Sequence, residues 1–157
     1  MLWLLRHGQA AHGVEGGDAA RPLTPWGERV VGDLGATLAA EGWRPARVFV
    51  SPLRRARQTA VLLLARVAPD LALETLDELE PEAGPEGVME ALRAHDALQG
   101  HVLLIGHQPL LGMLAERLAD GVEPGFSPAT LIGIAFDGAP ADGAGRVVTT
   151  RRPPPSP

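Results

Sequence analysis

The N-terminal stretch Leu2-Trp3-Leu4-Leu5-Arg6-His7-Gly8 constrains the fold of this chain more than any other part of the sequence. Four apolar residues, enough for a short buried strand, end abruptly in a cation, an imidazole and a glycine. In open α/β sheets, ligands bind at the carboxyl ends of the strands. The stretch therefore predicts a buried first strand that carries Arg6 and His7 to a ligand-binding edge.

The same succession of strand, polar turn and helix is predicted twice more. An apolar run over 47–50 leads through Ser51-Pro52 into a predicted helix over 53–67, and a run over 101–105 leads through Gly106-His107-Gln108-Pro109 into a predicted helix over 110–118. Thr24-Pro25 is typical of a helix start, with a cap followed by proline, and Ser51-Pro52 repeats this signal. The helix after Thr24 is expected to stop at Gly42.

The rest of the chain completes an alternating pattern of strands and helices. A weak strand is predicted over 71–76, an acidic loop over 77–87, a helix over 88–98 and a terminal hairpin from 130–136 and 146–150. This order predicts a three-layer α/β/α sandwich with a mainly parallel, mixed sheet. We expect one domain over residues 1–150 and a proline-rich, disordered tail over 151–157.

Composition excludes several classes of chemistry. The chain has no cysteine, so disulfides, thiolate metal sites and cysteine nucleophiles are excluded, and all 14 basic residues are arginine. A net charge of −5 disfavours nucleic acid and acidic membranes as partners. No apolar run approaches the roughly 18 residues of a membrane span. We expect a soluble, cytoplasmic protein with no membrane association.

The three strand-to-helix turns bring arginine and histidine together. Because the carboxyl ends of parallel strands lie at one edge of the sheet, groups a hundred residues apart converge there. Helix N-termini beside them add N–H donors and the positive end of a helix dipole. The predicted ligand is a phosphoryl group, and the remaining histidines show no spacing that suggests a metal site.

Three motifs in this order resemble those of the histidine phosphatase (phosphoglycerate mutase-like) superfamily. They are Arg6-His7-Gly8, then Ser51-Pro52-x-x-Arg55-Ala56-x-Gln58-Thr59, then Gly106-His107-x-Pro109. The short chain and Arg21-Pro22-Leu23-Thr24 resemble the small SixA-type phosphohistidine phosphatases. The resemblance implies a phosphoglycerate mutase-like fold without a large inserted cap.

The resemblance also implies roles for individual residues. His7 would attack phosphorus and form a phosphohistidine intermediate, without a metal or other cofactor. The expected acid that protonates the leaving group is Glu78, although Glu80, Glu82 or solvent would also serve. The groups expected to bind the phosphoryl oxygens during catalysis are Arg6, Gly8, Arg21, Arg55 and His107.

The leading hypothesis is thus a metal-independent phosphatase that acts on phosphohistidine in a phosphorylated protein. Two alternatives stay open at this point, a phosphatase for a small phosphomonoester and a non-catalytic phosphate-binding module. A mutase is disfavoured because the chain lacks the length to close over such substrates. The sequence predicts no particular oligomeric state.

Overall fold

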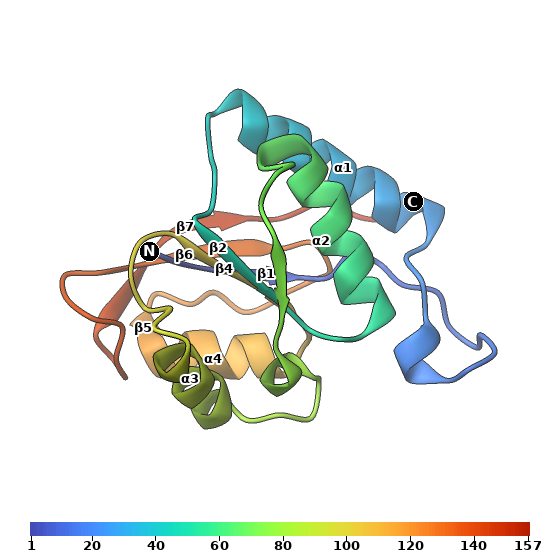
Figure 1. Cartoon of the computed structure of the whole chain (residues 1–157). Coiled ribbons are helices and arrows are strands. Elements are labelled where there is room, and N and C mark those ends of the chain that lie inside the picture. Colours follow the sequence, from blue (N-terminus) through green and yellow to red (C-terminus); the bar gives the residue numbers. More distant parts are fainter.

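The apolar runs of the sequence pair into one mixed sheet of seven strands (Figure 1). The computed structural model describes residues 1–157, and the strand order is β3-β2-β4-β1-β6-β7-β5. Four neighbouring strands are parallel: β1 (Leu2–Arg6), β2 (Arg47–Val50), β3 (Leu73–Thr75) and β4 (Val102–Gly106). The other three form the far edge: β6 (Leu131–Phe136), antiparallel to β1, then β7 (Gly145–Arg151) and the short β5 (Ala119–Asp120).

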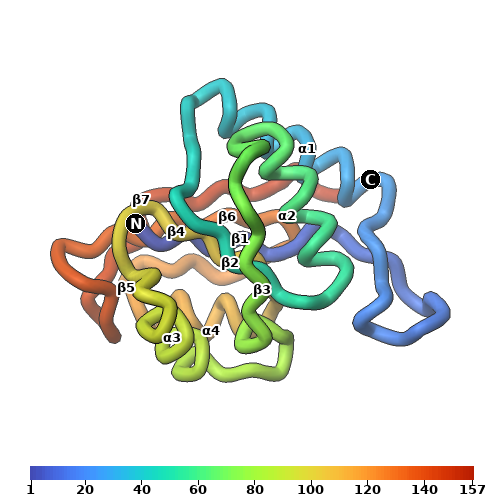
Figure 2. Tube along the Cα trace, in the orientation of Figure 1, coloured from blue at the N-terminus to red at the C-terminus, as the bar shows by residue number.

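Four helices cover the two faces of this sheet. α1 (Pro25–Ala40) and α2 (Arg54–Val67) lie on one face, and α3 (Pro85–Ala94) and α4 (Leu110–Leu118) lie on the other (Figures 1 and 2). Each face has its own buried apolar cluster. The predicted three-layer sandwich with a mainly parallel, mixed sheet is confirmed.

The central strand β1 contributes to both clusters. Trp3 and Leu5 pack on the side of α1 and α2, whereas Leu2 and Leu4 pack on the side of α3 and α4. Because alternate side chains of a strand point to opposite faces, a strand covered on both sides needs an unbroken apolar run. The run at the start of the chain therefore follows from the position of β1 inside the sheet.

Two helix starts differ from the sequence-based predictions. α2 begins at Arg54 with Leu53 as its N-cap, and the predicted cap at Ser51 was wrong because the Ser51 hydroxyl lies against His107 instead. α3 begins at Pro85, three residues before its predicted start, because proline is well suited to a first helical turn. By contrast, α1 begins as predicted, and the Thr24 hydroxyl accepts a hydrogen bond from the Gly27 N–H at 3.0 Å.

The register of the parallel strands aligns their carboxyl ends. Arg6 of β1 lies opposite Gly106 of β4, and Val50 of β2 lies opposite Ile105 of β4. The residues that follow these strands therefore meet at one edge of the sheet.

The division of the chain into a domain over 1–150 and a disordered tail stays a prediction. No helix has the length and apolar character needed to cross a membrane.

Candidate active site

Two histidines from opposite ends of the chain meet at the carboxyl edge of the sheet. His7 follows β1, His107 follows β4, and their ring centroids are 5.0 Å apart. Both side chains are buried. Arg55, in the first turn of α2, is also buried and donates from Nε to His7 Nε2 at 3.3 Å. The sheet thus brings these three predicted site residues together.

A backbone carbonyl fixes the tautomer of His7. Its Nδ1 lies 2.7 Å from the carbonyl oxygen of Gly8, which can only accept, so Nδ1 carries the proton and Nε2 holds a lone pair. Burial is the main cause that lowers the pKa of His7 to about 4; the Gly8 hydrogen bond opposes this shift, and Arg55, Arg6 and Arg21 lower the pKa further. At neutral pH His7 is therefore an uncharged imidazole with an unprotonated Nε2.

Gly8 fixes the backbone beneath His7. A Cβ atom at this position would lie 2.8 Å from Val31 Cγ2, so only glycine fits under α1. Its N–H donates to Thr59 Oγ1 at 3.0 Å, and the Thr59 hydroxyl donates to the Arg55 carbonyl. The Gly8 amide already has a partner, and its predicted contact with phosphate stays a prediction.

Asp18 links two of the predicted phosphate-binding arginines. Its carboxylate accepts from Arg55 Nη2 at 3.1 Å and from Arg21 Nη1 at 3.0 Å, and its backbone carbonyl accepts from Arg55 Nη1 at 2.8 Å. These arginines, with the Arg21 bond first, lower the pKa of Asp18. The sequence analysis missed Asp18, which lies in a short 3₁₀ helix (Asp18–Ala20) within a stretch whose sequence shows no periodicity. Its position three residues before Arg21 was the only signal.

Arg6 reaches the same region from the end of β1. Its Nη1 donates to the Phe126 carbonyl at 3.0 Å, while its Nε is buried without a hydrogen-bond partner. Burial and the neighbouring Arg55 lower the pKa of Arg6.

His107 has one nitrogen bonded and one nitrogen free. Nε2 lies 2.7 Å from Ser51 Oγ, and Nδ1 is buried without a partner. Burial lowers the pKa of His107 to about 3, assisted by His7 and Arg55. Buried polar groups are normally satisfied, so an orphaned nitrogen beside a nucleophilic imidazole indicates a place for a ligand.

This arrangement suits a tetrahedral oxyanion. Guanidinium groups stay protonated when buried and match the oxygens of a phosphoryl group, and an uncharged imidazole nitrogen lies among them. No group of three or more histidine, aspartate or glutamate side chains is arranged to hold a metal ion. The chemistry that these residues can perform is nucleophilic attack on phosphorus with electrostatic stabilisation.

The predicted acid is not part of this cluster. Glu78 lies in a short 3₁₀ helix (Asp77–Leu79) after β3, where its side chain is exposed and makes no hydrogen bond or ion pair. Glu80 and Glu82 are exposed as well. Protonation of the leaving group by any of the three stays a prediction.

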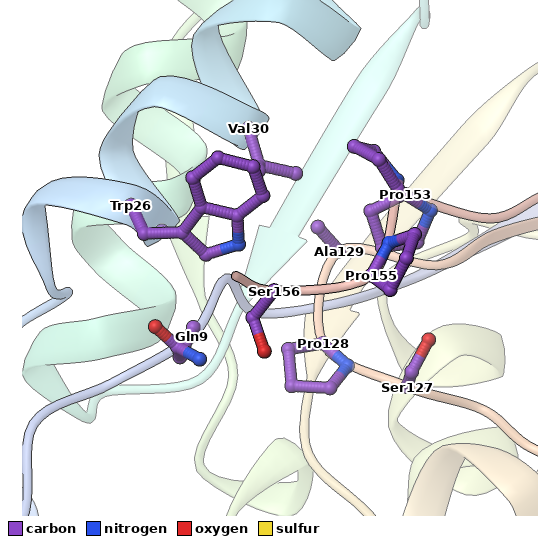
Figure 3. Close-up of a pocket in the computed structure, with 11 residues that line it drawn as sticks. Gln9, Trp26, Val30, Ser127, Pro128, Ala129, Pro153, Pro155 and Ser156 are labelled. Carbon is purple, nitrogen blue, oxygen red and sulfur yellow. The ribbon is translucent and has the colours of Figure 1, made fainter.

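A pocket lies beside the cluster without including it. The segment after Gly8 contributes Gln9, α1 contributes Trp26, and the C-terminal tail contributes Pro153, Pro155 and Ser156 (Figure 3). His7, His107 and Arg55 do not line this pocket. The C-terminal tail therefore lies next to α1 and to the segment that follows His7 and Gly8.

Sequence comparison identifies relatives of this chain. The family model of the histidine phosphatase superfamily (branch 1) matches residues 2–84. The phosphohistidine phosphatase SixA of Escherichia coli (strain K12) is 32% identical over 142 residues, which cover 87% of this chain and 85% of the relative.

Solved structures agree with the sequence comparison. A structure of the protein histidine phosphatase SixA complexed with tungstate superposes with a TM-score of 0.82 at 29% identity, covering 95% of this chain and 94% of that chain. A mycobacterial glucosyl-3-phosphoglycerate phosphatase complexed with VO3 reaches a TM-score of 0.67 at 18% identity, covering 94% and 97%, and shares the fold.

Proposed function

The chain belongs to the histidine phosphatase superfamily (branch 1), as a SixA-like member, and on that premise we propose that it hydrolyses phosphohistidine in a phosphorylated protein. The observation that carries the proposal is the state of His7. Its Nδ1–H donates to the Gly8 carbonyl, and its unprotonated Nε2 lies against Arg55. A histidine that only packs in the core needs neither a fixed tautomer nor an unprotonated Nε2 beside an arginine.

The reaction divides into two displacements at phosphorus. In the first, His7 Nε2 forms a bond to phosphorus while the bond from phosphorus to the substrate nitrogen breaks, and that nitrogen takes a proton from solvent or from Glu78. In the second, water attacks phosphorus, the bond to Nε2 breaks and inorganic phosphate leaves. Phosphorylated His7 keeps its Nδ1 proton, and Nδ1–H donates its hydrogen bond to the Gly8 carbonyl in both states.

Fixed donors stabilise the charge on the transferred group. We assign this role to Arg6, Arg21, Arg55 and His107. Arg6 and His107 each have a buried nitrogen without a hydrogen-bond partner. Arg21 and Arg55 each have guanidinium nitrogens that bond only to Asp18 and to backbone carbonyls. Phosphoryl transfer depends mainly on positioning and electrostatics, so such donors supply most of the catalysis.

A protein-borne substrate fits the surroundings of the site. The largest connection beside it, residues 7–24, contributes Asp18 and Arg21 and forms no separate lid domain (Figure 1). A site without a separate lid domain leaves space for a phosphorylated side chain on another protein. Two relatives, at 32% and 29% identity, are named phosphohistidine phosphatase and protein histidine phosphatase, which supports the same substrate class. A cytoplasmic phosphoprotein is therefore the proposed partner.

The test compares two substrates in the presence of a chelator. A phosphohistidine-bearing protein and p-nitrophenyl phosphate are offered to wild type, to His7→Ala and to His12→Ala, a control at an exposed loop histidine. We expect turnover by wild type and His12→Ala, faster on phosphohistidine, and loss of turnover in His7→Ala. A higher rate on p-nitrophenyl phosphate would instead favour a small phosphomonoester as the substrate. Phosphate binding without turnover of either substrate would contradict the proposal that the protein is an enzyme.

A further inference from the structure

We propose that Ser51 is a positioning residue that holds His107 in the tautomer with its proton on Nδ1, which then donates a hydrogen bond to the phosphoryl group. The tautomer follows from the contacts of Ser51 alone. The benefit to catalysis rests on the function proposed above.

Ser51 and His107 meet because their strands are neighbours. Ser51 directly follows β2, its N–H donates to the Ile105 carbonyl of β4 at 3.0 Å, and His107 lies two residues beyond Ile105. Pro52 restricts the preceding residue to extended backbone, which continues the direction of β2. The strand register thus sets the hydroxyl beside the imidazole.

The hydroxyl proton of Ser51 has one acceptor within reach. Ser51 is fully buried, and its Oγ has two partners, the Leu53 N–H at 3.3 Å and His107 Nε2 at 2.7 Å. The Leu53 N–H can only donate, so Oγ accepts there and must give its own proton to Nε2. A proton on Nε2 would leave the buried hydroxyl proton without any acceptor, which is costly. Nε2 is therefore unprotonated, and the ring proton is on Nδ1.

This assignment explains the orphaned nitrogen of the site. Nδ1 of His107 is buried without a partner, and its ring lies 5.0 Å from that of His7. A buried N–H donor without an acceptor in the free protein gains one when a phosphoryl oxygen enters. In the other tautomer the Nδ1 lone pair would face the anion and repel it. Since His107 is uncharged at neutral pH, the tautomer decides between attraction and repulsion.

The first measurement needs no substrate. A ¹H–¹⁵N correlation spectrum of the imidazole nitrogens in wild-type protein distinguishes a protonated from an unprotonated nitrogen in each histidine. We expect His107 to carry its proton on Nδ1 with an unprotonated Nε2, and a proton on Nε2 would overturn the proposal. In Ser51→Ala we expect the Nδ1–H tautomer to lose its dominance.

The second measurement asks whether Ser51 acts through His107. We expect Ser51→Ala to lower kcat/KM roughly 10- to 100-fold, chiefly through kcat, because a misdirected donor weakens stabilisation of the transition state. Ser51→Thr keeps the hydroxyl and is expected to recover most of that loss. In a His107→Ala background Ser51→Ala should change little more, because the group it positions is gone. An equal loss in both backgrounds would show an independent structural role and overturn the proposal.

The two proposals fail in different ways. If folded wild type turns over neither substrate, the proposed function fails, and binding of inorganic phosphate replaces kcat/KM as the readout in the same five proteins. Weaker phosphate binding in Ser51→Ala, absent in the His107→Ala background, would still support the positioning role. Unchanged phosphate binding in Ser51→Ala would overturn it.

Discussion

His7, the proposed nucleophile, is oriented by a neutral group rather than by a carboxylate. In Ser-His-Asp triads a buried carboxylate orients the imidazole and stabilises the imidazolium that forms. Here the Gly8 carbonyl orients Nδ1–H without adding a negative charge, and burial and the surrounding arginines keep the ring uncharged. This combination suits an imidazole that must attack phosphorus itself, since a protonated Nε2 could not.

On the proposed function, Asp18 competes with phosphate for Arg21 and Arg55. Replacing it by Asn removes the negative charge and keeps the backbone carbonyl that accepts from Arg55. Because the Asp18 side chain is 60% exposed, solvent screens the gain, and we expect phosphate to bind roughly fivefold more tightly to Asp18→Asn. Competitive inhibition by inorganic phosphate measures this, with the exposed Asp70→Asn as a control. Weaker inhibition would instead mean that Asp18 mainly holds the arginines in position.

At the scale of elements, the start of α1 packs directly on the backbone that follows the nucleophile. A Cβ atom on Gly27 would lie 2.2 Å from the Gln9 carbonyl oxygen, whereas one on Gly32 would meet nothing within 4 Å. We expect Gly27→Ala to lower the free energy of unfolding by about 1–3 kcal/mol. Gly32→Ala, in the same helix, should raise it by about 0.5–1 kcal/mol. Denaturant titrations of the two variants test the pair, and equal stabilities would refute the close approach.

The C-terminal segment supports Arg6 through the loop before β6. Arg152 binds the Glu123 carboxylate and the carbonyls of Pro124 and Gly125, and the next carbonyl in that loop, of Phe126, accepts from Arg6. We expect Arg152→Ala to lower kcat/KM roughly fivefold because Arg6 loses its fixed position.

The neighbouring Arg151 offers a matched control for this prediction. The Arg151 side chain is about as exposed as that of Arg152, and its ion pair with Glu41 lies away from the loop. Steady-state kinetics of Arg151→Ala should resemble wild type. Equal losses in the two variants would point to a general effect of charge rather than to the loop.

The sequence was informative wherever a local pattern determined an element. Leu2–Leu5 and the run before Gly106 predicted buried strands, and the parallel order predicted that His7, Arg55 and His107 would meet. Helix starts were less certain, because Ser51-Pro52 has the same form as a helix cap while its hydroxyl bonds to a distant histidine. Asp18 carried no periodic signal, since its role depends on two side chains brought to it by the fold.

At the scale of the whole molecule, the buried histidines make stability depend on pH. The pKa of His7 is about 4 in the folded chain and about 6.5 when unfolded, so the unfolded chain binds more protons between these values. Stability is full above about pH 6.5 and falls as the pH drops towards 4. From pH 7 to 5 we expect His7 to reduce the free energy of unfolding by about 2 kcal/mol, and His107 adds to this.

Urea titrations at pH 7 and pH 5 in phosphate-free buffer measure this dependence. The pKa of Asp18 is lowered from an already acidic value, so its carboxylate does not titrate in this window. A variant with both His7→Gln and His107→Gln should lose most of the pH dependence. An undiminished dependence in that variant would place the responsible groups elsewhere in the molecule.

The central claim is that Nε2 of His7 carries the phosphoryl group between substrate and water. The most direct test mixes the enzyme with excess phosphorylated substrate, quenches rapidly in alkali, where phosphohistidine survives, and maps the phosphate by mass spectrometry and ³¹P NMR. The account predicts phosphate on Nε2 of His7, and none in His7→Ala. Phosphate on Nδ1 of His7 or on any other residue, or product formation without a phosphorylated enzyme, would contradict it.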